Sequence, residues 1–494
     1  MSRKERFARR YRRARRMRQR RMVRPTNGES LLAMLRWFLG DGGIFAKLKL
    51  HGNTTWRPLN LAWLAFCWAW SESRNVTDAF AQAVEFCQDT SGSSALSTYQ
   101  GFMAAIVRWT PPFIDLLWLR LHSKIEEIGG KFWRIGDWVP IAFDGSRSSA
   151  PRTVANEQAF CATNYGKGKT ARYRKKKSKG MRRKANEKNK PQPQKPQAWI
   201  TMLWHMGLRL PWMWRLGPSN SSERAHVMDM LRTGNFPEGS LFCGDAGFVG
   251  YPLWSLIMQS GAEFLVRVGA NVSLLTEKAD WRLLKNGIVL CWPKEMMKSN
   301  LPPLRLRLVK IRLGKTTAWM LTSVLNPAKL TKKQILMFYK MRWGIEVEFR
   351  GLKQTLDRAD LRCRNDQRSL AELNWSIMGM AAAELFALKE QLSNKRRRAG
   401  KSSGAPDPKK RSLARTMRAI RRCIRKSHQV PLPQDNLQSA LRDAVTDSYE
   451  RKASKRARYA PPNPDKKPLG DPDVRKITDE QRRNLRQFTK RTAA

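Results

Sequence analysis

The sequence predicts an α/β fold preceded by a helical region, with basic segments at both ends of the chain. Two apolar runs, at residues 139–144 and 239–245, each end in an acidic residue close to a glycine, which is typical of a buried strand. In residues 331–361, apolar side chains instead recur three and four positions apart, the spacing of an amphipathic helix. Strands alternating with helices in this way predict a sheet covered by helices.

The N-terminal part of the chain divides into a basic arm and a helical domain. Residues 1–25 are rich in arginine and almost free of acids, so we expect an arm that binds nucleic acid. The arm loosely resembles an organellar presequence but lacks the serine-rich amphipathic pattern. Residues 26–136 read as helical, with possible DNA recognition: two consecutive short helices fit a helix-turn-helix whose second helix, at 97–109, enters a groove. Many all-helical domains have the same pattern. The helices expected here are 31–39, 60–70, 76–87, 97–109 and 113–128.

The region 137–270 contains both acid-terminated strands. The first delivers Asp144 at its C-terminal end and the second delivers Asp245. In isolation, such an acid is more often a turn or cap residue than a metal ligand. A basic stretch at 167–196 interrupts the region, and either attracts DNA or is simply a solvated insertion. The other expected elements are paired strands at 198–206 and 208–216, helices at 221–232 and 251–260, and a strand at 263–268.

The hydrophobic period changes to two between residues 271 and 325, which predicts a β-strand insertion. Residues 304–313 alternate, turn at Gly314-Lys315 and return through 316–324, as expected of a hairpin. An apolar helix follows at 370–388. Residues 393–494 read as a mostly disordered basic tail with one helix near 413–425.

The charge of the chain points to a polyanionic partner. Lysine and arginine number 95 against 40 aspartate and glutamate, giving a net charge of +55, and nucleic acid is the commonest polyanion. A spanning helix needs about 20 apolar residues, and the longest apolar run, 59–70, is too short. Seven cysteines stand singly without a CxxC pair, so we expect buried thiols in a reducing cytoplasm rather than a zinc finger or disulfides.

One face of the 331–361 helix carries four polar side chains. At about 100° per residue, Tyr339, Arg342, Glu346 and Lys353 fall within an arc of roughly 60° beside the apolar stripe. Glu348 falls on about the opposite side. Thr331 and Gln334 predict a capping box at the start of the helix, whereas Gly344 and Gly351 count mildly against a continuous helix. The alternative is a charged face that is simply solvated.

These residues carry a resemblance. The pattern Tyr339-x2-Arg342-x3-Glu346-x6-Lys353 resembles the YREK signature of DDE transposases of the insertion-sequence-four family, and Asp245-Ala-Gly247-Phe248 fits that family's Asp-x-Gly-Phe/Tyr pattern. The resemblance covers roughly residues 140–364. It implies an RNase H-like catalytic core with a β-rich insertion. The division of the chain would then be a basic arm at 1–25, a helical domain at 26–136, the core at 137–270 and 326–392, the insertion at 271–325 and the tail at 393–494.

The three acids suit metal-dependent phosphodiester chemistry. Cutting DNA requires charge stabilisation at both the attacking and the leaving oxygen, and two divalent ions about 3.5–4 Å apart supply it. Asp144, Asp245 and Glu346 offer oxygen ligands only, which favours two Mg²⁺ or Mn²⁺ ions per active site over zinc. We therefore expect these three residues to be catalytic metal ligands.

The resemblance also implies partners and a reaction. A transposase of this family cuts at the ends of its element and joins the freed 3′-OH to target DNA, with a hairpin step that these residues do not decide. By the same implication, Tyr339, Arg342 and Lys353 hold the terminal phosphate and bases, and two chains form a homodimer on paired double-stranded ends in the bacterial cytoplasm.

Trp292 is a candidate for stacking on a flipped base, with Trp281 and Trp319 as competitors and a structural role as the alternative for all three. Two other functions stay open: a catalytically inactive nucleic-acid-binding protein derived from a transposase, and an RNase H-like nuclease without strand transfer.

Overall fold

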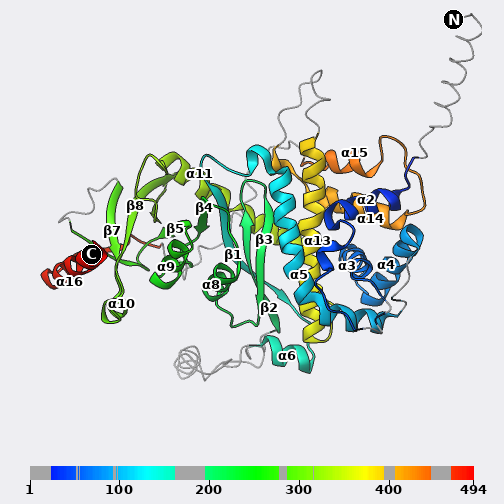
Figure 1. The fold of residues 1–494 in the computed structure, drawn as a ribbon, viewed down its shortest axis with the longest axis horizontal. Helices are drawn as coiled ribbons and strands as arrows, with labels where there is room; N and C mark the ends of the chain where they lie inside the picture. The colour runs from blue at the N-terminus through cyan, green and yellow to red at the C-terminus, as the bar shows by residue number, and fades with distance from the viewer. Residues whose placement is uncertain are drawn as a thin grey trace, which may run out of the picture.

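The computed structural model describes residues 24–51, 54, 56–92, 96, 98–161, 195–277, 286–314, 316–393, 407–446 and 469–493. Residues 1–23 of the expected basic arm and residues 167–194 of the basic stretch lie outside these residues, as does Trp281. In the described part, one mixed sheet extends from a helical body at one end of the molecule to the other end, where the β-strand insertion supplies its outer strands (Figure 1).

The sheet is built around the two strands that precede the acids. Its order is β10-β6-β7-β8-β9-β5-β4-β1-β2-β3. β1, β2 and β3 are antiparallel neighbours, whereas β4 and β5 run parallel to β1. Three antiparallel strands followed by two parallel ones form the mixed α/β arrangement of an RNase H-like core. The strands of this core are β1 (Val139–Ser149), β2 (Gln197–His205), β3 (Leu210–Gly217), β4 (Ser240–Gly244) and β5 (Glu263–Val268).

The insertion extends the same sheet rather than forming a separate one. Its last strand, β9, pairs antiparallel with β5 of the core, and β8 and β9 form the hairpin that the alternation predicts. At the far edge, β10 pairs with β6 in parallel. The strands of this part are β6 (Ser273–Thr276), β7 (Asn286–Cys291), β8 (Leu304–Leu313), β9 (Thr316–Thr322) and β10 (Asp473–Lys476).

The helical body joins the two ends of the sequence. Helix α13 (Asp366–Ser393) lies at its centre, and indole N–H groups tie the N-terminal helices to it: Trp70 donates to the carbonyl of Gly379 at 2.8 Å, and Trp375 donates to Thr110 at 2.8 Å. The other helices of the body are α2 (Asn27–Leu39), α3 (Pro58–Trp70), α4 (Val76–Ser91), α5 (Tyr99–Gly129), α14 (Leu413–Arg425) and α15 (Leu437–Arg442).

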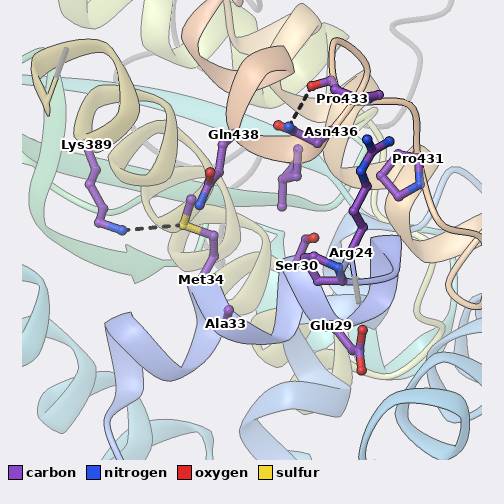
Figure 2. A pocket seen from close by; sticks show the side chains of 12 residues that line it. Arg24, Glu29, Ser30, Ala33, Met34, Lys389, Pro431, Pro433, Asn436 and Gln438 are labelled. Atoms are coloured by element: carbon purple, nitrogen blue, oxygen red, sulfur yellow. Dashed lines mark hydrogen bonds between the residues drawn. The ribbon is translucent and has the colours of Figure 1, made fainter. Parts of the chain in front are cut away.

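Much of the expected C-terminal tail is folded, which corrects the sequence prediction for residues 407–446 and 469–493. The expected helix near 413–425 is present as α14, and α14 and α15 pack against α2 and α13. The segment before α15 also closes a pocket of about 410 Å³ over α2 (Figure 2). At this pocket the Nζ atom of Lys389 contacts the sulfur of Met34, and the side-chain amide of Asn436 donates to the carbonyl of Pro433. Further along, helix α16 (Asp479–Ala493) follows β10. Long-range packing of this kind leaves no local signal in a basic sequence.

Helix α5 corrects a second expectation. The two short helices expected at 97–109 and 113–128 form one helix of 31 residues that contains Pro111 and Pro112. Proline costs a helix interior about 3 kcal/mol, but the buried side chains Phe102, Ile106 and Phe113 on either side hold the helix in the core. Residues 97–109 are therefore not a separate recognition helix. By length and composition alone α5 is also able to cross a membrane, yet its apolar side chains pack against α13.

Candidate active site

Asp144 and Asp245 lie at the same edge of two neighbouring parallel strands. The last residues that pair in this ladder are Ala142 on β1 and Cys243 on β4, so both acids come just beyond it. β1 does not end at Asp144, as the sequence suggested, because residues 144–149 continue to pair with β2. The Asp144 side chain is 17% exposed, and one of its oxygens accepts the N–H of Gly145 at 2.8 Å.

Asp245 is held in a turn by its own motif. Its Oδ1 atom accepts the N–H of Gly247 at 2.7 Å, and a side-chain amide of Asn271 donates to the carbonyl of Ala246 at 2.8 Å. Phe248 is buried and its ring lies 4.5 Å from that of Phe143, measured between centroids. The Asp-x-Gly-Phe pattern thus fixes the position of the carboxylate relative to β1.

The helix expected at 331–361 is two helices. The capping box of Thr331 and Gln334 is present at the start of α11 (Lys332–Arg342). This helix ends before Trp343, and a second helix, α12 (Gly344–Gln354), begins at the next residue. A Cβ atom on Gly344 would lie 2.2 Å from the Trp204 ring, so only glycine allows α12 to approach the sheet this closely. Glu346 falls in the first turn of α12.

Arg342 links two of the three acids. Its guanidinium lies 3.2 Å from Asp144 Oδ2 and 3.3 Å from Glu346 Oε1. The pKa of Asp144 is raised above its usual value, first by burial and also by the charges of Asp245 and Glu346, while Gly145 N–H and Arg342 oppose the rise. Residues far apart in the sequence therefore form one electrostatically coupled group.

The donor set of this group suits a hard divalent cation. Asp144, Asp245 and Glu346 provide only carboxylate oxygens, the ligands that Mg²⁺ and Mn²⁺ prefer. In the conformation described, no three Asp, Glu, His or Cys side chains within the described residues are arranged to hold a metal ion. The Arg342 guanidinium supplies the positive charge between Asp144 and Glu346 instead. These three acids are the residues that would hold the ions.

Two other signature residues, Tyr339 and Lys353, each lie near an arginine. The Tyr339 hydroxyl accepts a bond of 3.4 Å from Arg267 on β5. Lys353 is half-buried, and its pKa is lowered by burial and by the nearby charge of Arg147. Glu348, which the helical wheel placed on the opposite side, is buried next to Glu384 of α13.

The two tryptophans that compete for a base-stacking role within the described part of the chain are both buried. Trp292 is 4% exposed, and its indole N–H donates to the carbonyl of Leu301 at 2.8 Å. Trp319 is 5% exposed and donates to Asp471 at 2.8 Å. In this conformation both serve the packing of the insertion, and base stacking by Trp292 stays a prediction.

Three residues near the acids were not predicted from the sequence. Glu223 begins α8 (Glu223–Thr233), and its pKa is raised to about 7 by burial and by the charges of Asp144 and Asp245. Arg147 on β1 is exposed, with its guanidinium carbon 4.1 Å from the centre of the Trp199 ring. Trp343, at the break between α11 and α12, is 56% exposed. Ser222 caps α8, and an acid in the first turn of a helix is common in itself. Nothing in the sequence therefore linked Glu223 to Asp144.

A family model covers the segment of the chain that contains these residues. Residues 141–380 match the family model described as Transposase DDE domain. That segment contains Asp144, Asp245 and the complete Tyr339–Lys353 pattern, so this part of the chain is similar to transposase DDE domains. No curated protein sequence matches the chain.

One solved structure with a similar course of the chain is described as a cryo-EM structure of the piggyBac transposase synaptic complex with hairpin DNA. It is 14% identical, with a TM-score of 0.39, over 89% of this chain and 90% of that one.

Proposed function

We propose that this protein is a DDE transposase of the insertion-sequence-four type, which binds the inverted-repeat ends of its element and catalyses DNA strand cleavage and strand transfer. The observation that carries the proposal is the convergence of Asp144, Asp245 and Glu346 from β1, β4 and α12, inside the segment that matches transposase DDE domains. The YREK pattern around Glu346 supports the finer assignment to that family.

In this reaction the residues of the chain bind the metal ions and position the DNA phosphate. Two divalent ions, when bound, stabilise the charge on the attacking and leaving oxygens, and Asp144, Asp245 and Glu346 hold them. Arg342 pairs with both Asp144 and Glu346, and its planar fork can bind a DNA phosphate through two hydrogen bonds. Lys353 adds a point charge, and Tyr339 adds a hydroxyl or a stacking face.

The charge of the chain and the nature of the reaction define the partners. A net charge of +55 favours double-stranded DNA, both the element ends and the target. Joining two ends in one event calls for a homodimer on paired ends, in the bacterial cytoplasm where the DNA lies.

The decisive experiment incubates the purified protein and Mg²⁺ with a duplex that carries the terminal repeat flanking the gene. We expect nicking at the end followed by joining to a second duplex. Glu346→Gln removes a metal ligand and should abolish both steps, whereas Glu295→Gln, which changes an exposed glutamate of α10 (Lys294–Lys298), should change neither. Equal nicking by wild type and Glu346→Gln would remove Glu346 from the site. Nicking without joining would indicate the nuclease, and binding without nicking the inactive DNA-binding protein.

DNA binding should weaken steeply as salt concentration rises, because each phosphate contact releases counterions. Lys353→Gln should reduce the slope of log affinity against log salt by about 1, while exposed Lys294 of α10, changed to Gln in the same way, should leave it unchanged. An unaltered slope in Lys353→Gln would place that lysine off the DNA.

A further inference from the structure

A fourth carboxylate lies against β1 at the residue that follows Asp144. Glu223 lies at the start of α8, and its side chain reaches the strand at Gly145, the residue after Asp144. A Cβ atom on Gly145 would lie only 2.2 Å from the Glu223 carboxylate oxygen. The contact therefore depends on glycine at position 145.

The Glu223 carboxylate has no hydrogen bond or ion pair with any residue that the structure describes. Arg147 is the positive charge that acts on it, and that guanidinium is exposed and lies over the Trp199 ring. An acid in the first turn of a helix is favourable in itself. That effect does not explain why the side chain is directed at Gly145 and half-buried beside two other acids.

The positive charge in the site is distributed unevenly. Arg342 is 7% exposed and lies between Asp144 and Glu346. Its Nε atom has no partner among the described residues, although both terminal nitrogens contact carboxylates. Glu223 is coupled to Asp144 and Asp245 instead, and no described lysine or arginine forms an ion pair with Glu223 or Asp245. The side of Asp144 that faces Asp245 and Glu223 thus has several carboxylates and lacks a paired cation.

We propose that Glu223 is a fourth carboxylate of the metal site, beside Asp144 and Asp245, where it adds negative charge and accepts hydrogen bonds from water around a hydrated divalent cation. The inference rests on the proposed function, because it assumes that Asp144 and Asp245 hold an ion. Mg²⁺ and Mn²⁺ keep several waters when they bind to few carboxylates, so a carboxylate can contribute without direct coordination. Groups that contact metal ligands in this way typically change metal affinity by about 10- to 100-fold.

The test measures Mn²⁺ binding by calorimetry on metal-stripped, DNA-free protein, so that its readout is independent of catalysis. Glu223→Gln keeps the shape of the side chain and should weaken Mn²⁺ binding about tenfold or more. The matched control is Asp229→Asn on the same helix, whose carboxylate pairs with Arg215 at 2.6 Å, and it should bind as wild type does. Gly145→Ala is a second variant, which displaces the Glu223 carboxylate without removing its charge. It should weaken binding in the same direction, and the two effects should not add in the double variant.

The outcomes separate this inference from the proposed function. Wild-type Mn²⁺ affinity in Glu223→Gln, with binding lost in Asp144→Asn, would overturn the role of Glu223 and leave the proposed function intact. No specific Mn²⁺ binding by wild type, or equal binding by wild type and Asp144→Asn, would contradict the metal site itself. Unchanged thermal unfolding of the variants in EDTA verifies that a loss of affinity is not a loss of fold.

Discussion

Two glutamates on helix α12, only two positions apart, have opposite environments. Glu346 is about one-third exposed and joins Arg342 and Asp144 at the edge of the sheet. Glu348 is 6% exposed and lies beside Glu384, with Arg411 and Arg209 nearby. The comparison teaches that the helical period, rather than the residue type, separates a carboxylate available for chemistry from one that belongs to the core.

Arg411 should matter most to the buried side of this comparison. Its guanidinium lies 3.4 Å from Glu384 and donates to the carbonyls of Leu208 and Arg209. Arg411→Ala leaves the Glu348–Glu384 pair without this cation, and we expect a loss of about 3–5 kcal/mol in the free energy of unfolding. Urea unfolding measures it, with exposed Arg418→Ala on α14 as the control. A loss no larger than that of the control would show that the buried pair does not depend on Arg411.

Glu348 should also make stability depend on pH. Burial and the neighbouring Glu384 raise its pKa well above the usual value. Between the unfolded and the folded pKa, the folded state therefore binds more protons, so the free energy of unfolding falls as pH rises, by up to about 1.4 kcal/mol per pH unit for one proton. Glu348→Gln stays neutral and should flatten this slope when unfolding is measured across that range. A slope identical to that of wild type would assign the titration to another group.

Glu346 should contribute least to stability. Its contact with Arg342 is a partly exposed ion pair across the break between α11 and α12, a type worth about 0.2–1 kcal/mol. Glu346→Gln should therefore change the free energy of unfolding by about that amount, measured by the same urea titration, even though it should abolish cleavage. A loss of several kcal/mol would mean that Glu346 is mainly structural and would remove the contrast with Glu348.

Local patterns predicted the parts of the site that local geometry controls. Helical spacing separated Glu346 from Glu348, and the apolar runs located Asp144 and Asp245, because both signals repeat within a few residues. The alternation in the insertion also predicted the β8–β9 hairpin correctly.

The remaining features depend on contacts between distant segments. The signature helix is divided next to Gly344, which packs closely against Trp204, and α5 continues through Pro111 and Pro112. The folding of the C-terminal segment and the pairing of β9 with β5 also involve residues far apart in the sequence. Glu223 was missed for the same reason, since its relation to Asp144 exists only once α8 lies against β1.

The most direct test of the central claim maps where a bound metal lies. Fe²⁺ replaces Mg²⁺ in the purified protein, and hydrogen peroxide oxidises it to give hydroxyl radicals that cut the backbone next to the ion, while ascorbate reduces the iron again. The account predicts cuts close to Asp144, Asp245 and Glu346 in the same preparation, all suppressed by excess Mg²⁺ and lost together in Asp144→Asn. Cuts near only one of these residues, or cuts that Mg²⁺ does not suppress, would contradict a metal site shared by the three acids.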